Sequence, residues 1–596
     1  MNRIFDDMEG EFSARLRAHR VTTRTSRTRE GEVTLTSRVA LVEARFSIAV
    51  LDRLHEPSFI GLRRPTLDGE TYIIYEVVDV RPMHFQMLGV DIAVPKVIRR
   101  EFLETIDRSW EGSEETWIDV VAVPTDYRMD LKEGGVTFRR SNLTPLVGSE
   151  AHILSRETVR EFLCVEGGAE VGVLKGFNLP LTVNIGELVR YHTGFFGFTG
   201  CGKSNLASYL IRRVLEGTEE ITVVIFDVAG EYLIHLLDLA PYTYSTEDFR
   251  GEPRRIMGSQ AIPETLEGLL ERRHLEMAVE KLLEAGRIRR LSMAQPPKEI
   301  PLNLGLILRL IGGIADKGER ESIQAHIALN KLNAFMEVGG YEEDTTFEEI
   351  AGDPAAKAEL SRILTDFSTS IHSMSSTSKD IQAILRALNE ERSTGVERKT
   401  MPRNPEWLAS AVSHGPLSGL IIVYIPEPDI AREAVSRFVD HLLWLKKTQG
   451  TGRPVLTVID EAQEFIPDRT RREDYTEQSN RSVEALLRQG RKYRASCWVC
   501  SQRVAHLNVN ALQQLHSYFV SVLPRFYDRM VIADAFSLSY DLLDKTTELE
   551  TGEWLFVSYR ATKQRNVPIF LKTPNNEEIL ASNLSRLIKG PKISIT

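Results

Sequence analysis

The sequence predicts an α/β protein in which a mainly parallel sheet follows a small all-β domain and is interrupted by a helical insert. Short, continuously apolar runs such as 221–227 alternate with amphipathic helical segments, which is typical of a parallel sheet covered on both faces. Residues 31–150 hold β-branched, partly alternating runs between turn residues, the pattern of a small barrel or sandwich. Residues 237–400 place apolar residues mostly at helical spacing.

The composition excludes several classes of protein. With 42% hydrophobic and 27% charged residues, the chain can build cores and is not disordered. No run approaches the roughly 18 apolar residues of a membrane span, and the first residues lack the apolar stretch of a signal peptide. Four cysteines in 596 residues do not make a disulfide framework, so we expect a cytoplasmic protein without a membrane partner. Because the net charge is −10, any DNA contact requires local basic patches.

The length of the chain predicts several domains, since one domain usually takes roughly 100–200 residues. The arginine-rich first 30 residues are expected to be a solvated or frayed end. We expect an N-terminal extension at 1–30, a β-barrel at 31–150, a first part of the sheet domain at 151–236, the helical insert at 237–400, a second part of the sheet domain at 401–572 and a C-terminal tail at 573–596.

A phosphate-binding loop is predicted at 197–204, which matches G-x-x-x-x-G-K-[ST] between an apolar strand and a long helix. Glycines let backbone N–H groups turn inward, and the following helix points its positive end at the phosphates. Lys203 is expected to reach the β- and γ-phosphates of ATP, and Ser204 to offer its hydroxyl to Mg²⁺. The residues expected to bind nucleotide are Gly197, Thr199, Gly200, Cys201, Gly202, Lys203, Ser204 and Asn205.

Two acids follow the apolar strand predicted at 455–459, and they would lie at the carboxyl edge of the sheet, where ligands of parallel sheets bind. We expect Asp460 to hold Mg²⁺ through water and Glu461 to polarise the attacking water. Asp227 and Glu231 follow another strand at the same edge. They either support the metal and the water or act as acids at a helix N-terminus.

These motifs resemble those of a known family. The run GFTGCGKSN (197–205) resembles the GTTGSGKSN loop of the HerA/FtsK branch of RecA-like motor ATPases. The run FDVAGEY (226–232) is similar to the D-x-x-G-E-Y element of HerA proteins, and DEAQ (460–463) resembles their D-E-A-H. RQGRKY (488–493) resembles R-E-G-R-K-[YF], and SQR (501–503) resembles the start of S-Q-R-P.

The resemblance covers roughly 31–572 and implies a RecA-like P-loop core with an N-terminal HAS-like barrel and an inserted helical bundle. It also implies a ring, usually a hexamer, that pumps double-stranded DNA through its centre with ATP and Mg²⁺. Such proteins commonly accompany a nuclease, and relatives in antiphage defence accompany nuclease or sirtuin-like NADase subunits. Gln463, Val504 and Cys201 replace the usual histidine, proline and serine, which favours a divergent branch.

The resemblance further implies arginines that act across subunit boundaries, where they stabilise the charge on the γ-phosphate. Arg488 and Arg491 are the main candidates, followed by Arg525 and Lys492, and the alternative for each is a surface ion pair. Gln502 either senses the γ-phosphate or is a hydrogen-bonded amide at a strand end. The catalytic group expected is Lys203, Glu231, Glu461, Arg488, Arg491 and Gln502.

Two further patterns have competing interpretations. Arg469, Arg471 and Arg472 lie in a loop after the acidic strand end, which either touches DNA phosphates or is simply a solvated charged loop. Cys497 and Cys500 form a CxxC without a second pair, and strand alternation directs their sulfurs to opposite faces, which favours core packing.

The leading functional hypothesis is an ATP-driven ring motor that translocates duplex DNA and works with an effector. The alternative is a nucleotide-regulated oligomeric scaffold that assembles and activates a nuclease or NAD-hydrolysing subunit in antiphage defence. No motif for cleaving DNA or NAD is visible in the sequence, so that chemistry would belong to a partner.

Overall fold

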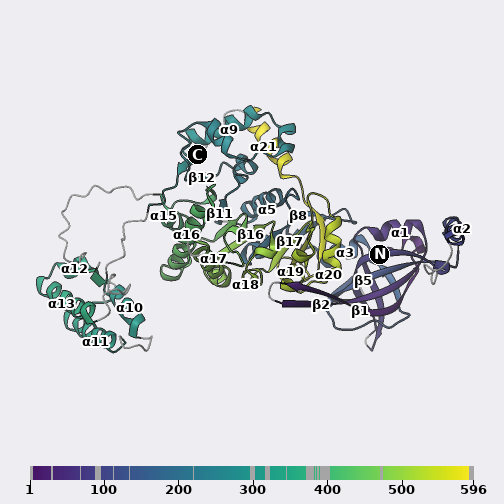
Figure 1. Cartoon of the computed structure of the whole chain (residues 1–596), viewed down its shortest axis with the longest axis horizontal. Helices are drawn as coiled ribbons and strands as arrows, with labels where there is room; N and C mark the ends of the chain where they lie inside the picture. Colours follow the sequence, from purple (N-terminus) through teal and green to yellow (C-terminus); the bar gives the residue numbers. More distant parts are fainter. Residues whose placement is uncertain are drawn as a thin grey trace. The chain divides into compact units, whose positions relative to one another are not determined.

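The computed structural model has two compact units, one comprising Met1–Met293 with Pro405–Thr596 and the other Ala294–Asn404 (Figure 1). The structure describes residues 4–28, 31–67, 69–87, 96–111, 113–132, 135–218, 220–294, 303–315, 322–343, 345–370, 381–382, 384–385, 388, 403–469 and 474–589. None of the helices within these ranges is long and apolar enough to cross a lipid bilayer.

The N-terminal strands form a sheet that closes on itself, because β2 pairs with both β1 and β5. The sheet runs β2-β1-β7-β3-β4-β5-β6, so the second contact of β2 completes a ring of strands around a core that includes Ile60, Ile73 and Val120. Closure of this kind removes exposed strand edges. The strands are β1 (Ala14–Thr28), β2 (Gly31–Arg45), β3 (Phe59–Thr66), β4 (Gly69–His84), β5 (Thr116–Lys132), β6 (Gly135–Arg140) and β7 (Glu150–Ile153).

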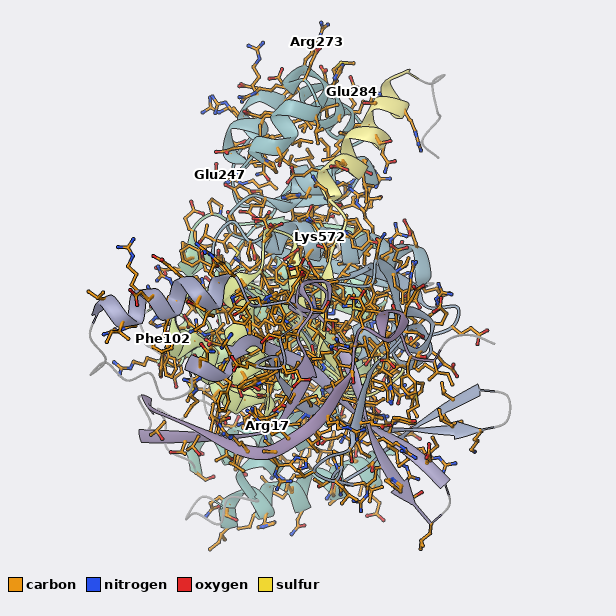
Figure 2. All side chains as sticks on the ribbon, turned by 90° about the vertical axis from the view of Figure 1, so that its right-hand side faces the viewer. Arg17, Phe102, Glu247, Arg273, Glu284 and Lys572 are labelled. Atoms are coloured by element: carbon orange, nitrogen blue, oxygen red, sulfur yellow. The ribbon has the colours of Figure 1, made fainter. Side chains whose placement is uncertain are left out.

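The expected solvated extension at 1–30 is wrong for most of its length, because β1 pairs along β2 from Ala14 to Thr28. Ala14 and Leu16 are buried, whereas Arg15 and Arg17, which alternate with them, are exposed. Arg17 is labelled in Figure 2. This is the two-residue alternation of a half-buried strand. The abundance of arginine hid that alternation in the sequence.

Helix α2 (Lys96–Asp107) carries several apolar side chains that are largely exposed among the residues that the structure describes. Val97 is 72% exposed, and Ile98, Phe102 and Leu103 are between 41% and 47% exposed. Phe102 lies at the margin of the view in Figure 2. Only Ile106 of this helix is a fully buried apolar residue among those that the structure describes.

A sheet of 12 strands forms the centre of the larger unit, in the order β13-β12-β14-β11-β15-β16-β10-β17-β18-β19-β8-β9, and it confirms the α/β class. It is parallel from β13 to β17 and antiparallel from β17 to β9. The strands are β8 (Ala169–Leu174), β9 (Leu179–Val183), β10 (Thr193–Phe196), β11 (Thr222–Asp227), β12 (Tyr242–Ser245), β13 (Ile288–Arg290), β14 (Gly419–Tyr424), β15 (Val455–Ile459), β16 (Ala495–Ser501), β17 (Ser517–Val520), β18 (Glu553–Ser558) and β19 (Ile569–Lys572).

Helices cover both faces of this sheet, and two separate apolar cores result. One core includes residues of α5, α9 and α21, and the other includes residues of α15, α16, α17 and α19. The helices of this unit outside α2 are α1 (Ile48–His55), α3 (Arg156–Leu163), α4 (Ile185–Arg190), α5 (Lys203–Gly217), α6 (Tyr232–His235), α7 (Pro253–Ser259), α8 (Glu264–Leu269), α9 (Arg272–Glu284), α15 (Pro405–Ser413), α16 (Pro428–Thr448), α17 (Thr476–Gln489), α18 (Val509–Leu512), α19 (Phe526–Phe536), α20 (Tyr540–Lys545) and α21 (Asn576–Lys589).

Two boundaries of the expected sheet domain require correction. The predicted helical insert at 237–400 contains β12 and β13, which extend the parallel sheet beyond β14. These strands have only four and three residues, too short for a periodic signal. The predicted tail at 573–596 contains α21, whose Leu580 and Leu584 lie one turn apart and are buried.

The second unit is helical in the residues that the structure describes. It comprises α10 (Leu304–Ala315), α11 (Ser322–Gly339), α12 (Phe347–Ala351) and α13 (Pro354–Ser370). The helices enclose their own apolar core, to which Ile307, Leu332 and Leu364 belong. Such a separate core is what allows a segment to fold as a compact unit.

A buried arginine joins the helix after the phosphate loop to the C-terminal helix. Arg212 on α5 donates to the carboxylate of Asp238 at 2.6 and 2.7 Å and to the side-chain oxygen of Asn576 at 2.6 Å. The side chains of Arg212 and Asp238 are only 3% and 2% exposed. Asn583 of α21 also donates to Asp238, at 2.7 Å.

We expect Arg212→Ala to destabilise the larger unit by about 3–5 kcal/mol, because it leaves the Asp238 carboxylate buried without its cation. The neighbouring Arg213 is a matched control, since its pair with Glu216 is partly exposed, at 31% and 59%, and such a pair is worth less than about 1 kcal/mol. Urea unfolding followed by circular dichroism would compare the two variants. Equal transitions for Arg212→Ala and Arg213→Ala would show that the buried pair does not hold these helices together.

Candidate nucleotide site at the carboxyl edge of the sheet

The phosphate loop leaves the end of β10 and enters α5 at Lys203. Gly200 and Gly202 have φ angles of +83° and +95°, a region that favours glycine. A Cβ atom at Gly197 would lie 2.5 Å from the Cys201 sulfur, so this position also requires glycine. The tight loop leads directly into the N-terminus of α5. A glycine-rich loop at the positive end of a helix is the arrangement that binds phosphate.

The side chains of the loop have distinct places. Lys203 folds back and donates to the carbonyl oxygens of Gly197 at 3.1 Å and Phe198 at 3.3 Å. Cys201 packs inward, where burial raises the pKa of its thiol. Asn205 turns its side chain away from the loop, toward the Pro574 oxygen at 3.2 Å and the Asn576 nitrogen at 2.7 Å. The predicted role of Asn205 in nucleotide binding is therefore supported only by its position beside Ser204.

Carboxylates from two neighbouring strands gather beside Ser204. The Ser204 hydroxyl donates to Glu231. Asp227 accepts from the backbone nitrogens of Gly230 at 2.7 Å and Tyr232 at 2.9 Å, so it fixes the turn that presents Glu231. Burial raises the pKa of Asp227 to about 6. Burial, followed by the nearby charges of Asp227, Glu231 and Glu461, raises the pKa of Asp460 well above its usual value.

Glu461 is held by two glutamine side chains. Its carboxylate accepts from Gln502 Nε2 at 2.8 Å and also from Gln463 Nε2. Thr199 of the phosphate loop donates to Gln502, and Ser501 donates to the Gln463 oxygen at 2.6 Å. Gln502 is thus a hydrogen-bonded amide in this structure. The same bonds connect the phosphate loop to Glu461, the residue expected to polarise the attacking water.

The topology explains why these residues meet. Strand β16 lies between β10 and β15 and pairs with both in parallel. The end of β16 therefore delivers Ser501 and Gln502 between the phosphate loop and Asp460-Glu461. Glu461 itself has φ +46°, the left-handed conformation, which turns the chain sharply after β15. Such strain in a non-glycine residue is common at functional sites.

The donor set fits Mg²⁺, which prefers hard oxygen ligands and usually keeps water and substrate phosphates in its shell. The Ser204 hydroxyl and the Glu231 and Asp460 carboxylates supply such oxygens beside the phosphate loop. Within the part of the chain that the structure describes, no three His, Cys, Asp or Glu side chains form a metal site of their own.

Comparisons with known proteins agree with this geometry. The family model "Helicase HerA, central domain" matches residues 169–402. The DNA double-strand break repair helicase HerA of Sulfolobus acidocaldarius is 23% identical over 433 residues, which are 70% of this chain and 72% of that protein. The protein of the same name from Saccharolobus solfataricus is 22% identical over 426 residues, with the same two coverages. These similarities support a HerA/FtsK-type P-loop ATPase.

Solved structures similar to this HerA/FtsK-type ATPase include VirB4 of Thermoanaerobacter pseudethanolicus. The TM-score is 0.34 at 16% identity, and the match covers 68% of this chain and 96% of that chain. The bacterial conjugative coupling protein TrwB gives a TM-score of 0.33 at 12% identity, over 71% of this chain and 92% of that chain.

The two main candidates for trans arginines, Arg488 and Arg491, do not join this site. Arg488, Arg491 and Lys492 lie just before β16, at the amino edge of the sheet, whereas the phosphate loop follows β10 at the carboxyl edge. Arg488 is exposed and pairs with Glu484 at 3.4 Å. Arg491 lies over the ring of Tyr191, with its guanidinium carbon 4.5 Å from the ring centroid. Arg525 follows β17 and is exposed at the same edge as the phosphate loop.

The arginines of the loop after β15 and the two cysteines of β16 are the remaining predicted residues. Arg469 is exposed in the loop after β15, and Arg471 and Arg472 lie outside the described residues. Cys497 and Cys500 are unpaired, buried and assigned to different cores on the two faces of the sheet, which agrees with core packing. Burial raises the pKa of both thiols.

The sequence does not predict that the turn at Thr551 and Gly552 contacts the phosphate loop. Gly552 donates its N–H to the Cys201 oxygen at 3.1 Å, and the Thr551 hydroxyl donates to the Gly200 oxygen at 3.3 Å. Thr573 in turn donates its N–H to Gly552 at 2.9 Å. The Thr551-Gly552 turn signal is visible in the sequence, but a contact with a loop 350 residues away leaves no local pattern.

We expect Glu461→Gln to bind ATP and to hydrolyse it about 10²–10⁴-fold more slowly, because the amide keeps the shape but loses the charge that orients water. Lys203→Ala is expected to abolish hydrolysis by weakening ATP binding as well. Steady-state hydrolysis and equilibrium binding of a fluorescent ATP analogue would separate these effects. A Glu461→Gln rate within about threefold of wild type would assign the base to another acid, with Glu231 next.

A second expectation concerns pH. The pKa of Asp460 is raised in the folded protein, so the native state binds its proton more tightly than the unfolded chain does. Its contribution to stability is therefore lost as pH rises above the usual Asp range toward the raised pKa. In nucleotide-free, metal-free protein, Asp460→Asn should lose less thermal stability than wild type between pH 5 and pH 8. Parallel curves for the two proteins would contradict the raised pKa of Asp460.

Proposed function

We propose that this ATPase forms a ring motor that binds and translocates double-stranded DNA with ATP and Mg²⁺. The observation that carries the proposal is the division of the site between two edges of one sheet. The phosphate loop and the acids occupy the carboxyl edge, and Arg491 is at the amino edge. Because β16 has seven residues, these edges are roughly 20 Å apart. In a ring, the Arg491 of one copy can reach the nucleotide site of the next copy, which its own Arg491 does not reach.

The chain's own residues have defined tasks in hydrolysis. Lys203 would exchange the Gly197 and Phe198 carbonyls for the β- and γ-phosphates. Glu461 would accept a hydrogen bond from the attacking water while Gln502 and Gln463 keep its carboxylate in place. Bound Mg²⁺ would supply positive charge to the phosphates and relieve the repulsion among the carboxylates. Ser204 and Asp460 would hold it, the latter through water.

The bonds of Gln502 support coupling between nucleotide state and the rest of the site. Gln502 donates to Glu461 and accepts from Thr199, so a γ-phosphate beside Thr199 would compete for one of these bonds. The amide would then act as the γ-phosphate sensor predicted from the sequence. The change would reach the base directly, because the same side chain bonds both groups.

Duplex DNA is the proposed substrate because the similar proteins of Sulfolobus acidocaldarius and Saccharolobus solfataricus are named as DNA double-strand break repair helicases. The exposed Arg469 belongs to the loop proposed to face the central channel. Contacts of arginine with phosphate are independent of base sequence and sensitive to salt. We propose a hexamer, as the family resemblance implies.

We propose that the ring works with an effector subunit, a nuclease or a sirtuin-like NADase, in antiviral defence. The family resemblance is the basis for this partner. The exposed apolar residues Val97, Ile98, Phe102 and Leu103 of α2 favour it, since solvent-facing apolar clusters often mark protein contacts. A scaffold that only regulates such a partner is the alternative.

Duplex DNA should stimulate ATP hydrolysis by the isolated protein, and the stimulation should fall as salt rises. Displacement of a third strand from a DNA triplex would show movement along the duplex, and Glu461→Gln protein is the control that binds without moving. If DNA leaves the rate of ATP hydrolysis unchanged but an effector protein alters it, the scaffold is favoured instead.

A further inference from the structure

Two arginines from distant parts of the chain share one aromatic ring at the amino edge of the sheet. The guanidinium carbon of Arg491 lies 4.5 Å from the Tyr191 ring centroid, and that of Arg560 lies 5.6 Å from it. His516 packs against the same tyrosine, with ring centroids 4.9 Å apart. Tyr191 is buried, whereas both arginines are exposed.

The two cations lack a carboxylate partner. Among the residues that the structure describes, neither Arg491 nor Arg560 lies within ion-pair distance of an acid, in contrast to Arg488 with Glu484 at 3.4 Å. Burial, reinforced by the charges of Arg491 and Arg560, lowers the pKa of His516, which keeps that ring neutral near pH 7. Two like charges held together without an anion make a site that an anion would stabilise.

The backbone holds Arg560 in place. Strand β18 runs antiparallel to β17, and its last residue, Ser558, pairs with Ser517 at the amino edge. The Ser558 hydroxyl accepts from the backbone nitrogens of Arg560 at 3.2 Å and Ala561 at 2.9 Å. Tyr559 donates its N–H to His516 at 2.9 Å, so the loop is fixed on both sides of Arg560. A guanidinium on a rigid support is preorganised for its ligand.

Resting on the proposed ring, we propose that Arg560 is a second trans cation that, together with Arg491, binds the γ-phosphate of a nucleoside triphosphate held by the neighbouring copy. Its own phosphate loop is at the opposite edge, roughly 20 Å away across β16. An arginine side chain is too short to cross the sheet along β16, so Arg560 serves another copy. The planar fork of each guanidinium suits two phosphate oxygens, and Tyr191 holds the pair side by side.

The first test is the ATPase activity of full-length variants without DNA. Arg560→Ala should lower kcat at least about tenfold with KM for ATP within about threefold, since the contact strengthens as charge develops on the γ-phosphate. Arg560→Lys keeps the charge and should fall between Arg560→Ala and wild type. The matched control is Lys563→Ala, an exposed cation of the same loop, which should retain wild-type activity. Thermal unfolding and size-exclusion chromatography show whether fold and assembly are intact.

The second test mixes inactive variants under conditions of proven subunit exchange. Arg560→Ala with excess Lys203→Ala should gain activity, because intact phosphate loops then meet intact arginine pairs. Arg560→Ala with Arg491→Ala should gain none, because every boundary lacks one member of the pair. Activity in this last mixture would overturn the proposal, since the two arginines would then serve different sites.

The remaining outcomes separate the proposal from the ring on which it rests. If Arg491→Ala gains activity with Lys203→Ala but Arg560→Ala does not, the ring stands and Arg560 acts only within its own copy. If neither gains, the trans arrangement itself fails. Should Arg560→Ala weaken duplex DNA binding and leave hydrolysis without DNA unchanged, the anion is a DNA phosphate, and the proposed role is wrong.

Discussion

The parallel register of β10, β16 and β15 is the constraint on which the nucleotide site depends. Because all three strands end at one edge, Gln502 lies within hydrogen-bond reach of both the phosphate loop and Glu461. The central position of β16 is decisive, since its terminal amide can bond to both neighbours at once. The same register places the approach to β16, with Arg491, at the other edge.

Electrostatics at the carboxyl edge are unfavourable in the isolated protein. Burial raises the pKa of Asp460, and repulsion from the nearby carboxylates of Asp227, Glu231 and Glu461 raises it further. The positive end of α5 and the Lys203 ammonium offset part of this charge. At the amino edge the imbalance is reversed, because Arg491 and Arg560 share the Tyr191 ring and neither has an acid within ion-pair distance in the described part of the chain. The two unbalanced edges are complementary in charge, which favours contact between copies once a nucleotide is bound.

The sequence predicts the centre of the fold better than its margins. Continuously apolar β11 and β15 and the glycine loop at 197–202 have strong local signals, and the structure places them as predicted. Strand β1 was missed because arginine on its exposed face masked the alternation, and β12 because four residues show no period. The cover from Gly552 depends on tertiary contact alone, as does the meeting of Arg560 with Tyr191.

The C-terminal segment is mechanically connected to the first turn of the helix that follows the phosphate loop. Asn205, next to Ser204, bonds Pro574 and Asn576, and Arg212 two turns later bonds Asn576 again. Any rotation of this turn when the Ser204 hydroxyl leaves Glu231 would therefore be transmitted to α21. The C-terminal helix is thus suited to report nucleotide state, and a fluorophore attached at the exposed Ser582 would read each turnover as a change in signal.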